Sequence, residues 1–283
     1  MQTTTPSLEA GDYIEAGGNR IHYHEAGSGE TILFVHGSGP GVTAWANWRN
    51  ALPLFSEKFH VLAPDLLGFG YSARPEGAQY GKDMWVDALI AFLKAKGVKK
   101  CHMVGNSLGG ALSLALAARE PQMIERIVLM GAAGTSYPVG KGLEAVWGYT
   151  PSFENMHELI AEHFAYDPSL ATKDLVQMRY EASMQPGFQE SYSTMFPPPY
   201  QRHVEALVTP DDEIRKITSP TLLLHGREDK VVPLSASLKM ESLLPNADMH
   251  IFGKCGHWTM IEKKDDFNRL VMDHFLAHSA VKA

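Results

Sequence analysis

Short apolar runs alternate with helical patterns along the first half of the chain, and this alternation predicts the class of fold. The apolar runs are rich in Val, Leu and Met and end at Gly, Pro or polar residues, as buried strands do. The predicted strands span residues 20–26, 31–36, 59–64, 100–106, 126–131, 221–225 and 248–252. Amphipathic helices are predicted over residues 80–96, 108–119 and 264–277. Such a strand–helix rhythm is typical of a mostly parallel sheet covered by helices on both faces, so we expect an α/β protein.

The first two predicted strands are expected to pair with each other. Residues 20–26 and 31–36 flank the segment Gly27-Ser28-Gly29. A short connection that contains glycine, between two apolar runs, favours a β-hairpin.

The strand rhythm stops near residue 135 and resumes near residue 220, which indicates an insertion into the core. Residues 135–210 carry 11 of the 27 aromatic residues, and they include the run Pro197-Pro198-Pro199. Aromatic enrichment without strand signals favours a helical lid with an apolar underside, although an ordinary second layer of helices would have the same composition. We therefore expect a core domain of residues 1–134 and 211–283, and a lid (cap) domain of residues 135–210.

Charge and cysteine content narrow the class of protein. The chain has 25 Lys and Arg against 32 Asp and Glu, a net charge of −7, which argues against general affinity for nucleic acid or anionic membranes. Its most apolar stretch, residues 111–118, is too short to span a bilayer. The two cysteines, Cys101 and Cys255, suggest no disulfide framework, and residues 1–11 do not resemble a signal peptide. We therefore expect a cytoplasmic protein.

A candidate nucleophile lies between a predicted strand and a predicted helix. Residues 105–109 read Gly-Asn-Ser-Leu-Gly, the G-x-S-x-G pattern, and they connect a strand to a helix as that pattern requires. The serine of such a turn has a strained backbone, so its neighbours must be small. This context predicts that Ser107 is a nucleophile.

A serine in this position needs a histidine base and an orienting acid, which follow it in the order Asp, His. Asp229 and His257 each lie in a loop after a predicted strand, at the edge where open α/β sheets place their sites. Glu228 is a rival acid. Asp229 is preferred because Val231-Val232-Pro233 follow it, as expected of a loop that returns onto the protein.

An oxyanion hole requires two N–H groups that point at the developing charge. One is expected from Leu108, which follows the nucleophile. The other is expected from the loop at residues 36–41, where Ser38 is the preferred donor and Gly39 the second choice, because Pro40 has no N–H. A dinucleotide-binding loop is disfavoured because the glycine spacing does not match G-x-G-x-x-G.

One arginine is predicted on the apolar face of a helix in the insertion. Leu175, Met178, Arg179 and Ala182 follow the i, i+3, i+4, i+7 spacing of one helix face. A cation on such a face needs an anionic partner, which is either a substrate or a salt bridge, unless the side chain reaches the edge of the lid. His22 and His24 would share one strand face, but no third ligand is placed by spacing, so no metal or other cofactor is expected.

These motifs resemble those of the meta-cleavage product hydrolases, the carbon–carbon hydrolases of bacterial aromatic catabolism within the α/β-hydrolase superfamily. The resemblance covers essentially the whole chain and is carried by HGSGPG at residues 36–41, WANW at 45–48, GNSLGG at 105–110 and GKCGHW at 253–258. Residues 179–183 and 185–197 are most similar to the branch that acts on 2-hydroxymuconic semialdehyde and 2-hydroxy-6-oxohepta-2,4-dienoate. The resemblance implies an α/β-hydrolase fold with an eight-stranded sheet and cleavage of the C5–C6 bond of dienoates with small 6-substituents. We also expect a homo-oligomer, a dimer or larger.

The resemblance also implies roles for individual residues. Arg179 matches the arginine that holds the dienoate carboxylate, and a guanidinium suits this bidentate pairing. Further candidates for substrate binding are Asn47, Asn106, Trp258 and Gly39, and weaker candidates for the 6-substituent pocket are Trp147, Leu143, Ala133 and Val231.

Two other functions share part of this pattern. A carboxylesterase would use the same triad, and a ligand receptor could retain the hydrolase fold. Arg179 discriminates against an esterase for neutral esters, which has no use for a cation on its lid, and the intact triad discriminates against a receptor.

Overall fold

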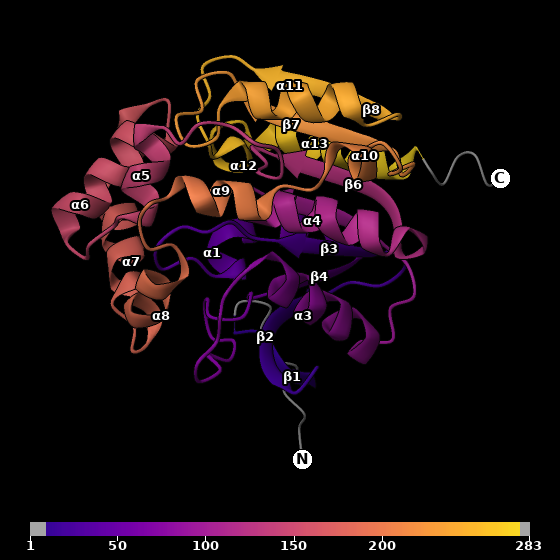
Figure 1. Ribbon diagram of the computed structural model, residues 1–283, viewed down its shortest axis with the longest axis horizontal. Helices are drawn as coiled ribbons and strands as arrows, with labels where there is room; N and C mark the ends of the chain where they lie inside the picture. The colour runs from indigo at the N-terminus through magenta and orange to yellow at the C-terminus, as the bar shows by residue number, and fades with distance from the viewer. Residues whose placement is uncertain (1–9, 278–283) are drawn as a thin grey trace.

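A single eight-stranded sheet lies at the centre of the protein, with helices on both of its faces (Figure 1). The computed structural model describes residues 10–277. The strand order is β1-β2-β4-β3-β5-β6-β7-β8; β1, β2 and β4 are joined by antiparallel pairing, and the strands from β4 to β8 by parallel pairing. The predicted α/β class and mostly parallel sheet are therefore confirmed.

The strands agree with the predicted runs to within a few residues, apart from β1, which was not predicted. They are β1 (Asp12–Ala16), β2 (Asn19–Ala26), β3 (Thr31–Val35), β4 (His60–Pro64), β5 (Cys101–Asn106), β6 (Ile124–Met130), β7 (Thr221–Gly226) and β8 (Ala247–Phe252). All side chains of β3, β5 and β7 are buried, whichever face they point to. Helices that cover both faces explain why these strands appear as continuous apolar runs.

The helices of the core flank the sheet, and a second group of helices follows β6. The core helices are α1 (Ala44–Trp48), α2 (Leu52–Phe55), α3 (Lys82–Ala95), α4 (Leu108–Arg119), α10 (Asp211–Ile214), α11 (Leu234–Leu243), α12 (Thr259–Glu262) and α13 (Lys264–Leu276). The second group consists of α5 (Lys141–Trp147), α6 (Phe153–Glu158), a π-helical turn at Leu159–Phe164, α7 (Lys173–Ser183), α8 (Phe188–Met195) and α9 (Gln201–Leu207).

The expected pairing of the first two strands is wrong. β4 lies between β2 and β3, so that Tyr23 of β2 faces Pro64 of β4 and the other edge of β4 pairs with β3. The outer edge of β2 is covered by β1, a short edge strand whose polar sequence DYIEA gave no apolar run. Gly27 is therefore not a hairpin residue. A Cβ atom on it would lie 2.1 Å from the carbonyl oxygen of Phe59, so this glycine permits close approach to the segment that leads into β4.

The helices α5 to α8 stand together at one end of the sheet, beyond the carboxyl ends of its parallel strands (Figure 1). Between Met130 and Thr221, all of which is described, the chain forms helices and no strand. The N–H of Thr209 donates a hydrogen bond to the carbonyl oxygen of Gly134 at 2.9 Å. The two ends of the inserted segment therefore meet at one point on the core.

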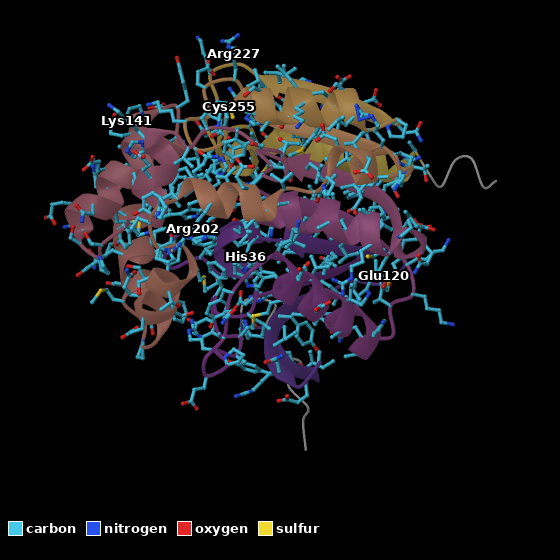
Figure 2. All side chains as sticks on the ribbon, viewed as in Figure 1. His36, Glu120, Lys141, Arg202, Arg227 and Cys255 are labelled. Carbon is cyan, nitrogen blue, oxygen red and sulfur yellow. The ribbon has the colours of Figure 1, made fainter. Side chains whose placement is uncertain are left out.

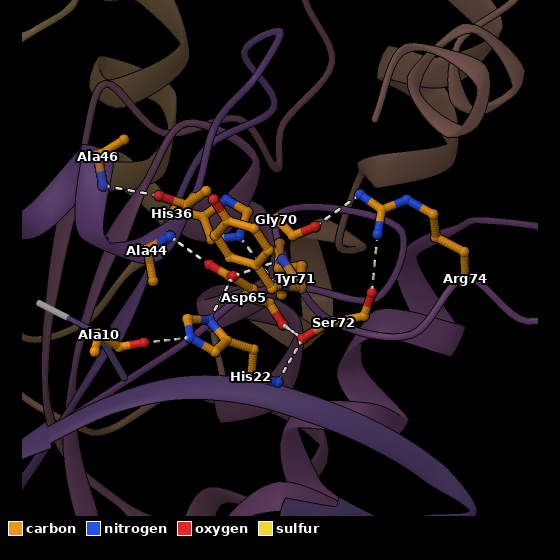
Figure 3. Close-up of polar contacts among 12 residues, drawn as sticks. Ala10, His22, His36, Ala44, Ala46, Asp65, Gly70, Tyr71, Ser72 and Arg74 are labelled. Carbon is orange, nitrogen blue, oxygen red and sulfur yellow. Dashed lines mark hydrogen bonds and ion pairs between the residues drawn. The ribbon is translucent and has the colours of Figure 1, made fainter. Parts of the chain in front are cut away.

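Asp65, which directly follows β4, organises the loops at this end of the sheet (Figure 3). Its carboxylate accepts hydrogen bonds from the N–H of Ala44 at 2.6 Å and the N–H of Tyr71 at 2.9 Å, and it pairs with Nδ1 of His22 at 2.8 Å. Burial alone would raise the pKa of Asp65, but the hydrogen bond and charge of His22 lower it overall. A buried anion with three partners therefore ties the start of α1 and the loop after β4 to β2.

We expect Asp65→Asn to reduce the free energy of unfolding by about 3 kcal/mol, because it removes one partner of a buried ion pair and turns an amide towards N–H donors. Urea denaturation at neutral pH measures this change. Asp87→Asn removes the exposed ion pair with Arg119 and serves as the matched control, with an expected loss below about 1 kcal/mol. Equal midpoints for the two variants would contradict the role of Asp65.

Candidate active site

Ser107 lies on a sharp turn between β5 and α4. Its backbone has φ 54° and ψ −114°, a conformation that L-residues rarely adopt, and its N–H donates to the carbonyl oxygen of Met130 at 3.0 Å. A Cβ atom on Gly109 would lie 2.2 Å from the carbonyl oxygen of Val35, so a larger residue would push α4 away from β3. The motif therefore forms the strained strand–turn–helix that the sequence predicted.

Asp229 and His257 are brought together from the loops after β7 and β8. Nδ1 of His257 lies 2.7 Å from Oδ2 of Asp229, while Oδ1 of Asp229 accepts hydrogen bonds from the N–H groups of Val231 and Val232 at 2.8 and 2.9 Å. Burial alone would raise the pKa of Asp229, but the charge and hydrogen bond of His257 lower it overall. An ionised Asp229 holds a proton on Nδ1 and leaves Nε2 of His257 free to accept one.

The carboxyl end of β6 brings this pair close to the serine. Met130, whose carbonyl oxygen binds the N–H of Ser107, precedes Gly131. A Cβ atom on Gly131 would lie 3.1 Å from Oδ2 of Asp229 and 3.1 Å from Nδ1 of His257. The nucleophile, acid and base predicted from sequence therefore meet at one edge of the sheet, although they lie far apart along the chain.

Glu228, the rival acid, faces away from this group. One of its carboxylate oxygens accepts from the N–H of Cys255 at 3.1 Å, and the other pairs with Arg227. Figure 2 shows Arg227 at the rim of the molecule, consistent with its largely exposed side chain. Glu228 thus braces the loop after β8, and the preference for Asp229 agrees with the geometry.

A buried histidine that the sequence analysis did not single out lies behind Asp229. His225, in β7, directs Nε2 to the carbonyl oxygen of Val232 at 3.0 Å and Nδ1 to the hydroxyl of Ser237 at 2.7 Å. Burial lowers the pKa of His225, which keeps it neutral, and its Nε2 lies 3.5 Å from Oδ2 of Asp229. Its signal in the sequence is the i, i+4 spacing to Asp229.

The loop after β3 lies against the serine. A Cβ atom on Gly37 would lie 3.2 Å from Cβ of Ser107, which places the Gly37–Ser38 peptide beside the nucleophile. The hydroxyl of Ser38 accepts a hydrogen bond from Nε1 of Trp147 at 3.1 Å, and its carbonyl oxygen lies 3.1 Å from the hydroxyl of Tyr192. Two side chains of the inserted helices, one of which the sequence analysis missed, therefore fix Ser38 between the core and the insertion.

Leu108, the second predicted donor, is the first residue of α4. N–H groups in the first turn of a helix have no partner within the helix. The N–H of Leu108 is therefore free for a ligand beside Ser107, as an oxyanion hole requires.

Arg179 is 94% buried on α7, so the expected burial of this cation is observed; of its predicted neighbours, Leu175 and Ala182 are half-buried, but Met178 is not on the buried face. The buried residues of α7 are Val176, Arg179 and Ser183, whereas Met178 is 41% exposed. The error arises because Met178 was assigned to the core for being apolar. The buried residues of α7, Val176, Arg179 and Ser183, follow the spacing i, i+3, i+7, which does not include Met178.

The guanidinium of Arg179 reaches the loop after β3. Its Nη2 donates to the carbonyl oxygen of Pro40 at 3.2 Å, while Nε is buried without a partner. Within residues 10–277, Arg179 forms no ion pair, so the salt-bridge alternative is not realised in the described chain. Burial, together with the charge of Arg49, lowers the pKa of Arg179 to about 10, so it still carries its charge at neutral pH.

Asn47, Asn106 and Trp258 are all buried near these groups. Nδ2 of Asn47 has no partner, whereas Nδ2 of Asn106 donates to the carbonyl oxygen of Met130 at 3.3 Å. Trp258 stacks on Phe164 with a centroid distance of 4.6 Å. Asn106 therefore braces the elbow, and Asn47 keeps a free donor.

The four weaker candidates lie where the inserted helices meet the core. Trp147, Leu143, Ala133 and Val231 are all buried. Trp147 stacks on Phe196 at 4.5 Å with the rings nearly parallel. α5 approaches the loop of Asp229 closely, because a Cβ atom on Gly142 would lie 2.0 Å from the carbonyl oxygen of Lys230. These contacts hold α5 against the loop that carries Asp229.

Metal and membrane sites are not supported within residues 10–277. No three His, Cys, Asp or Glu side chains come together there as a metal site would need, and Nδ1 of His22 is occupied by Asp65. In the same range, no helix combines the length and apolarity needed to cross a lipid bilayer.

Comparison with known proteins identifies the class that this fold and site define. A family model described as the alpha/beta hydrolase fold matches residues 30–264. The chain therefore belongs to the α/β-hydrolase fold family, in which a strained serine between a strand and a helix is characteristic.

Similar proteins narrow this assignment. The chain is 49% identical to a 2-hydroxy-6-oxo-2,4-heptadienoate hydrolase of Pseudomonas putida over 97% of its length and 99% of the relative's. It is 47% identical to a 2-hydroxymuconate semialdehyde hydrolase of a Pseudomonas species, over 100% of its length and 99% of the relative's. The solved structure of the meta-cleavage product hydrolase CumD from Pseudomonas fluorescens, in complex with acetates, is 52% identical and superposes with a TM-score of 0.94 over 96% of this chain and 100% of that one. Within the α/β-hydrolases, the chain is a meta-cleavage product hydrolase.

Proposed function

We propose that this enzyme hydrolyses the C5–C6 bond of 2-hydroxy-6-oxo-2,4-dienoates with small 6-substituents, in the degradation of aromatic compounds. The products are 2-hydroxypenta-2,4-dienoate and a small carboxylic acid. The observation that carries the proposal is Arg179, a buried cation whose Nε lacks a partner, placed beside the loop of Ser38. A ligand carboxylate would supply the anion that this guanidinium lacks. The names of the relatives above point to the same substrates.

The geometry supports a two-stage reaction at Ser107, Asp229 and His257. The dienol binds with its carboxylate at Arg179, and His257, oriented by Asp229, delivers a proton to C5 while the 2-hydroxyl loses its proton, so that C2 becomes a ketone and the existing C6 ketone is no longer conjugated. C6 is then attacked either by Ser107 or by a water that Ser107 assists, and the N–H groups of Ser38 and Leu108 hold the oxyanion. Cleavage of the C5–C6 bond leaves its electron pair on C5, from which it delocalises through C4 and C3 onto the C2 oxygen. That oxygen takes back the proton that His257 removed from the nucleophile, which gives 2-hydroxypenta-2,4-dienoate, and water supplies the hydroxyl group of the carboxylic acid.

Residues 135–210 act as the lid of this site, over a core of residues 1–134 and 211–283. The meeting of Gly134 and Thr209 at the base of the segment supports these boundaries. Trp147 and Tyr192, which contact Ser38, and Phe164, which stacks near His257, are the lid residues closest to the chemistry. Asn47, Asn106, Gly39 and Trp258 would contact the dienoate, and Leu143, Ala133 and Val231 would line the 6-substituent pocket with Trp147.

We also propose a cytoplasmic enzyme that works as a homo-oligomer without a metal or other cofactor. Its two cysteines are free and buried, which suits a reducing compartment. The triad generates its nucleophile without a metal. Light scattering coupled to size-exclusion chromatography measures the oligomeric state.

The function is tested by turnover of coloured meta-cleavage products against p-nitrophenyl esters. We expect kcat/KM for 2-hydroxy-6-oxohepta-2,4-dienoate to exceed that for p-nitrophenyl acetate by several orders of magnitude. A preference for the ester would indicate a carboxylesterase. Binding of the dienoate without turnover would indicate a receptor.

We expect kcat/KM to fall sharply between 6-isopropyl and 6-phenyl substrates, and only modestly among 6-hydrogen, 6-methyl and 6-isopropyl. Trp147 stacks on Phe196 and donates a hydrogen bond to the hydroxyl of Ser38. These two contacts hold its indole in place, so it cannot easily move to admit a planar phenyl ring. Steps of one methylene in an apolar pocket change binding by only about 1–3 kcal/mol. Steady-state kinetics with the four substrates measure the profile. Comparable values for 6-phenyl and 6-methyl would contradict it.

A further inference from the structure

A cleft lined by two arginines extends outward from Arg179 of the candidate active site. It is a cleft of about 650 Å³ between α1, α7 and the first two strands, and it is lined by both Arg49 and Arg179. Its aromatic lining includes Tyr13, Trp45 and Tyr71, and none of its lining residues is Asp or Glu. Although the protein has a net charge of −7, the charge of this cleft is positive, which favours an anionic ligand.

The two guanidinium groups in this cleft have no counter-ion in the described chain. Across residues 10–277, neither Arg49 nor Arg179 forms an ion pair, and Nη1 of Arg49 donates only to the carbonyl oxygen of Ala46 at 2.9 Å. Burial lowers the pKa of Arg49, and the charge of Arg49 in turn lowers the pKa of Arg179. Two neighbouring cations that repel each other would both be stabilised by a bound anion.

The arginines also share a smaller cavity, which is lined by Trp258, the residue after His257. It has a volume of about 20 Å³ and is lined by Arg49, Arg179, Asn47 and Trp258, among others. Two donors are buried there without partners: Nδ2 of Asn47 and Nε of Arg179. A cavity of this size holds about one water-sized group, such as one oxygen atom of a carboxylate.

We propose that Arg49 forms an outer carboxylate site, where the anionic substrate binds in the cleft before its carboxylate passes to Arg179. The aromatic rings of Trp45 and Tyr71 provide faces for the planar unsaturated chain. The site takes small unsaturated carboxylates and rests on the proposed function for its biological ligand. Arg49 would therefore affect how fast and how tightly the substrate is captured, and would leave the chemical step unchanged.

The test measures binding of sorbate, a planar hexadienoate that lacks the 6-oxo group and cannot be cleaved. We expect Arg49→Gln to weaken sorbate binding about tenfold in isothermal titration, because a cleft of one charge sign raises the local concentration of its counter-ion. Arg49→Lys should retain most of the affinity. Arg269→Gln, which removes an exposed arginine on α13, is the control and should bind as the wild type does. Sorbyl alcohol, which has no charge, should bind all variants alike.

A second pair of variants changes the charge of the cleft while both arginines stay in place. Met178 lines the cleft and is 41% exposed, so Met178→Glu and Met178→Gln should both fold. We expect only the glutamate variant to weaken sorbate binding. Equal affinities for wild type, Arg49→Gln and Met178→Glu would overturn the outer site, as would equal losses for sorbate and sorbyl alcohol.

Turnover measurements distinguish a failure of the outer site at Arg49 from a failure of the proposed function. With a cleavable dienoate, Arg49→Gln should lower kcat/KM about tenfold and flatten its dependence on salt, while kcat stays within about twofold. Hydrolysis of p-nitrophenyl acetate should not change. If the wild-type enzyme cleaved no dienoate, the proposed function would fail, and the sorbate titrations would still decide whether Arg49 binds carboxylates.

Discussion

Ser107→Ala is expected to reduce kcat for the preferred dienoate by about 10³-fold or more, with the fold intact. The nucleophile and its base act as a unit, so removing the hydroxyl abolishes the benefit of His257 and Asp229 as well. The strained turn is fixed by its glycines and by the hydrogen bond to Met130, none of which involves the hydroxyl. Stopped-flow absorbance at the wavelength of the coloured substrate measures the loss.

The same variant provides information about the order of steps. If His257 delivers the proton to C5, the alanine variant should still convert the dienol to its ketone, and the colour should change without release of the acid. Ser242→Ala, an exposed serine on α11, is the matched control and should be fully active. More than a tenth of normal turnover in Ser107→Ala would show that the triad is wrongly assigned.

Arg179→Gln is expected to lower kcat/KM by about 100-fold for every dienoate, whatever its 6-substituent. The loss corresponds to about 3 kcal/mol, the order expected when one partner of a buried charged pair is truncated. The effect is uniform because the carboxylate end of the substrate is the same throughout the series. Steady-state kinetics over the series measure it.

Neutral substrates and a second arginine of the inserted segment supply the controls. Arg179→Gln should change hydrolysis of p-nitrophenyl acetate by less than about threefold, since that ester carries no carboxylate. Arg202→Gln alters an exposed arginine on α9, labelled in Figure 2, and should leave both activities unchanged. An equal loss on esters and dienoates would show that Arg179 supports the fold of the lid and not the substrate.

The parts of this molecule that the sequence predicts are those whose signals are local. β3, β5 and β7 are buried on both faces, so their apolar runs stand out, and the serine elbow needs glycines at fixed positions. β1 is a polar edge strand and gives no such run. The pairing of β2 with β4 depends on a strand that lies far along the chain, which no local turn reveals.

The candidate site shows the same division. Asp229 and His257 are predicted together because each follows a strand, in the order expected for a triad, and the structure places their side chains in contact. Tyr192 and Phe164 contact the site only through the docking of the inserted helices, so no spacing in the sequence points to them. Arg179 was found by periodicity, but its buried neighbours were not, because an exposed methionine and a buried one look the same in sequence.

The contact between Phe164 and His257 has a consequence for protein engineering. The carbonyl oxygen of Phe164 accepts a hydrogen bond from the N–H of His257 at 2.7 Å, and the two rings stack with an interplanar angle of 20°. The segment that we propose as the lid therefore also supports the histidine that we propose as the general base. Chimeras can exchange this segment between homologous enzymes in order to transfer selectivity. Such chimeras have to preserve the contact between the π-helical turn and His257. A graft chosen only for the residues that line its pocket would bind the new substrate and turn it over poorly.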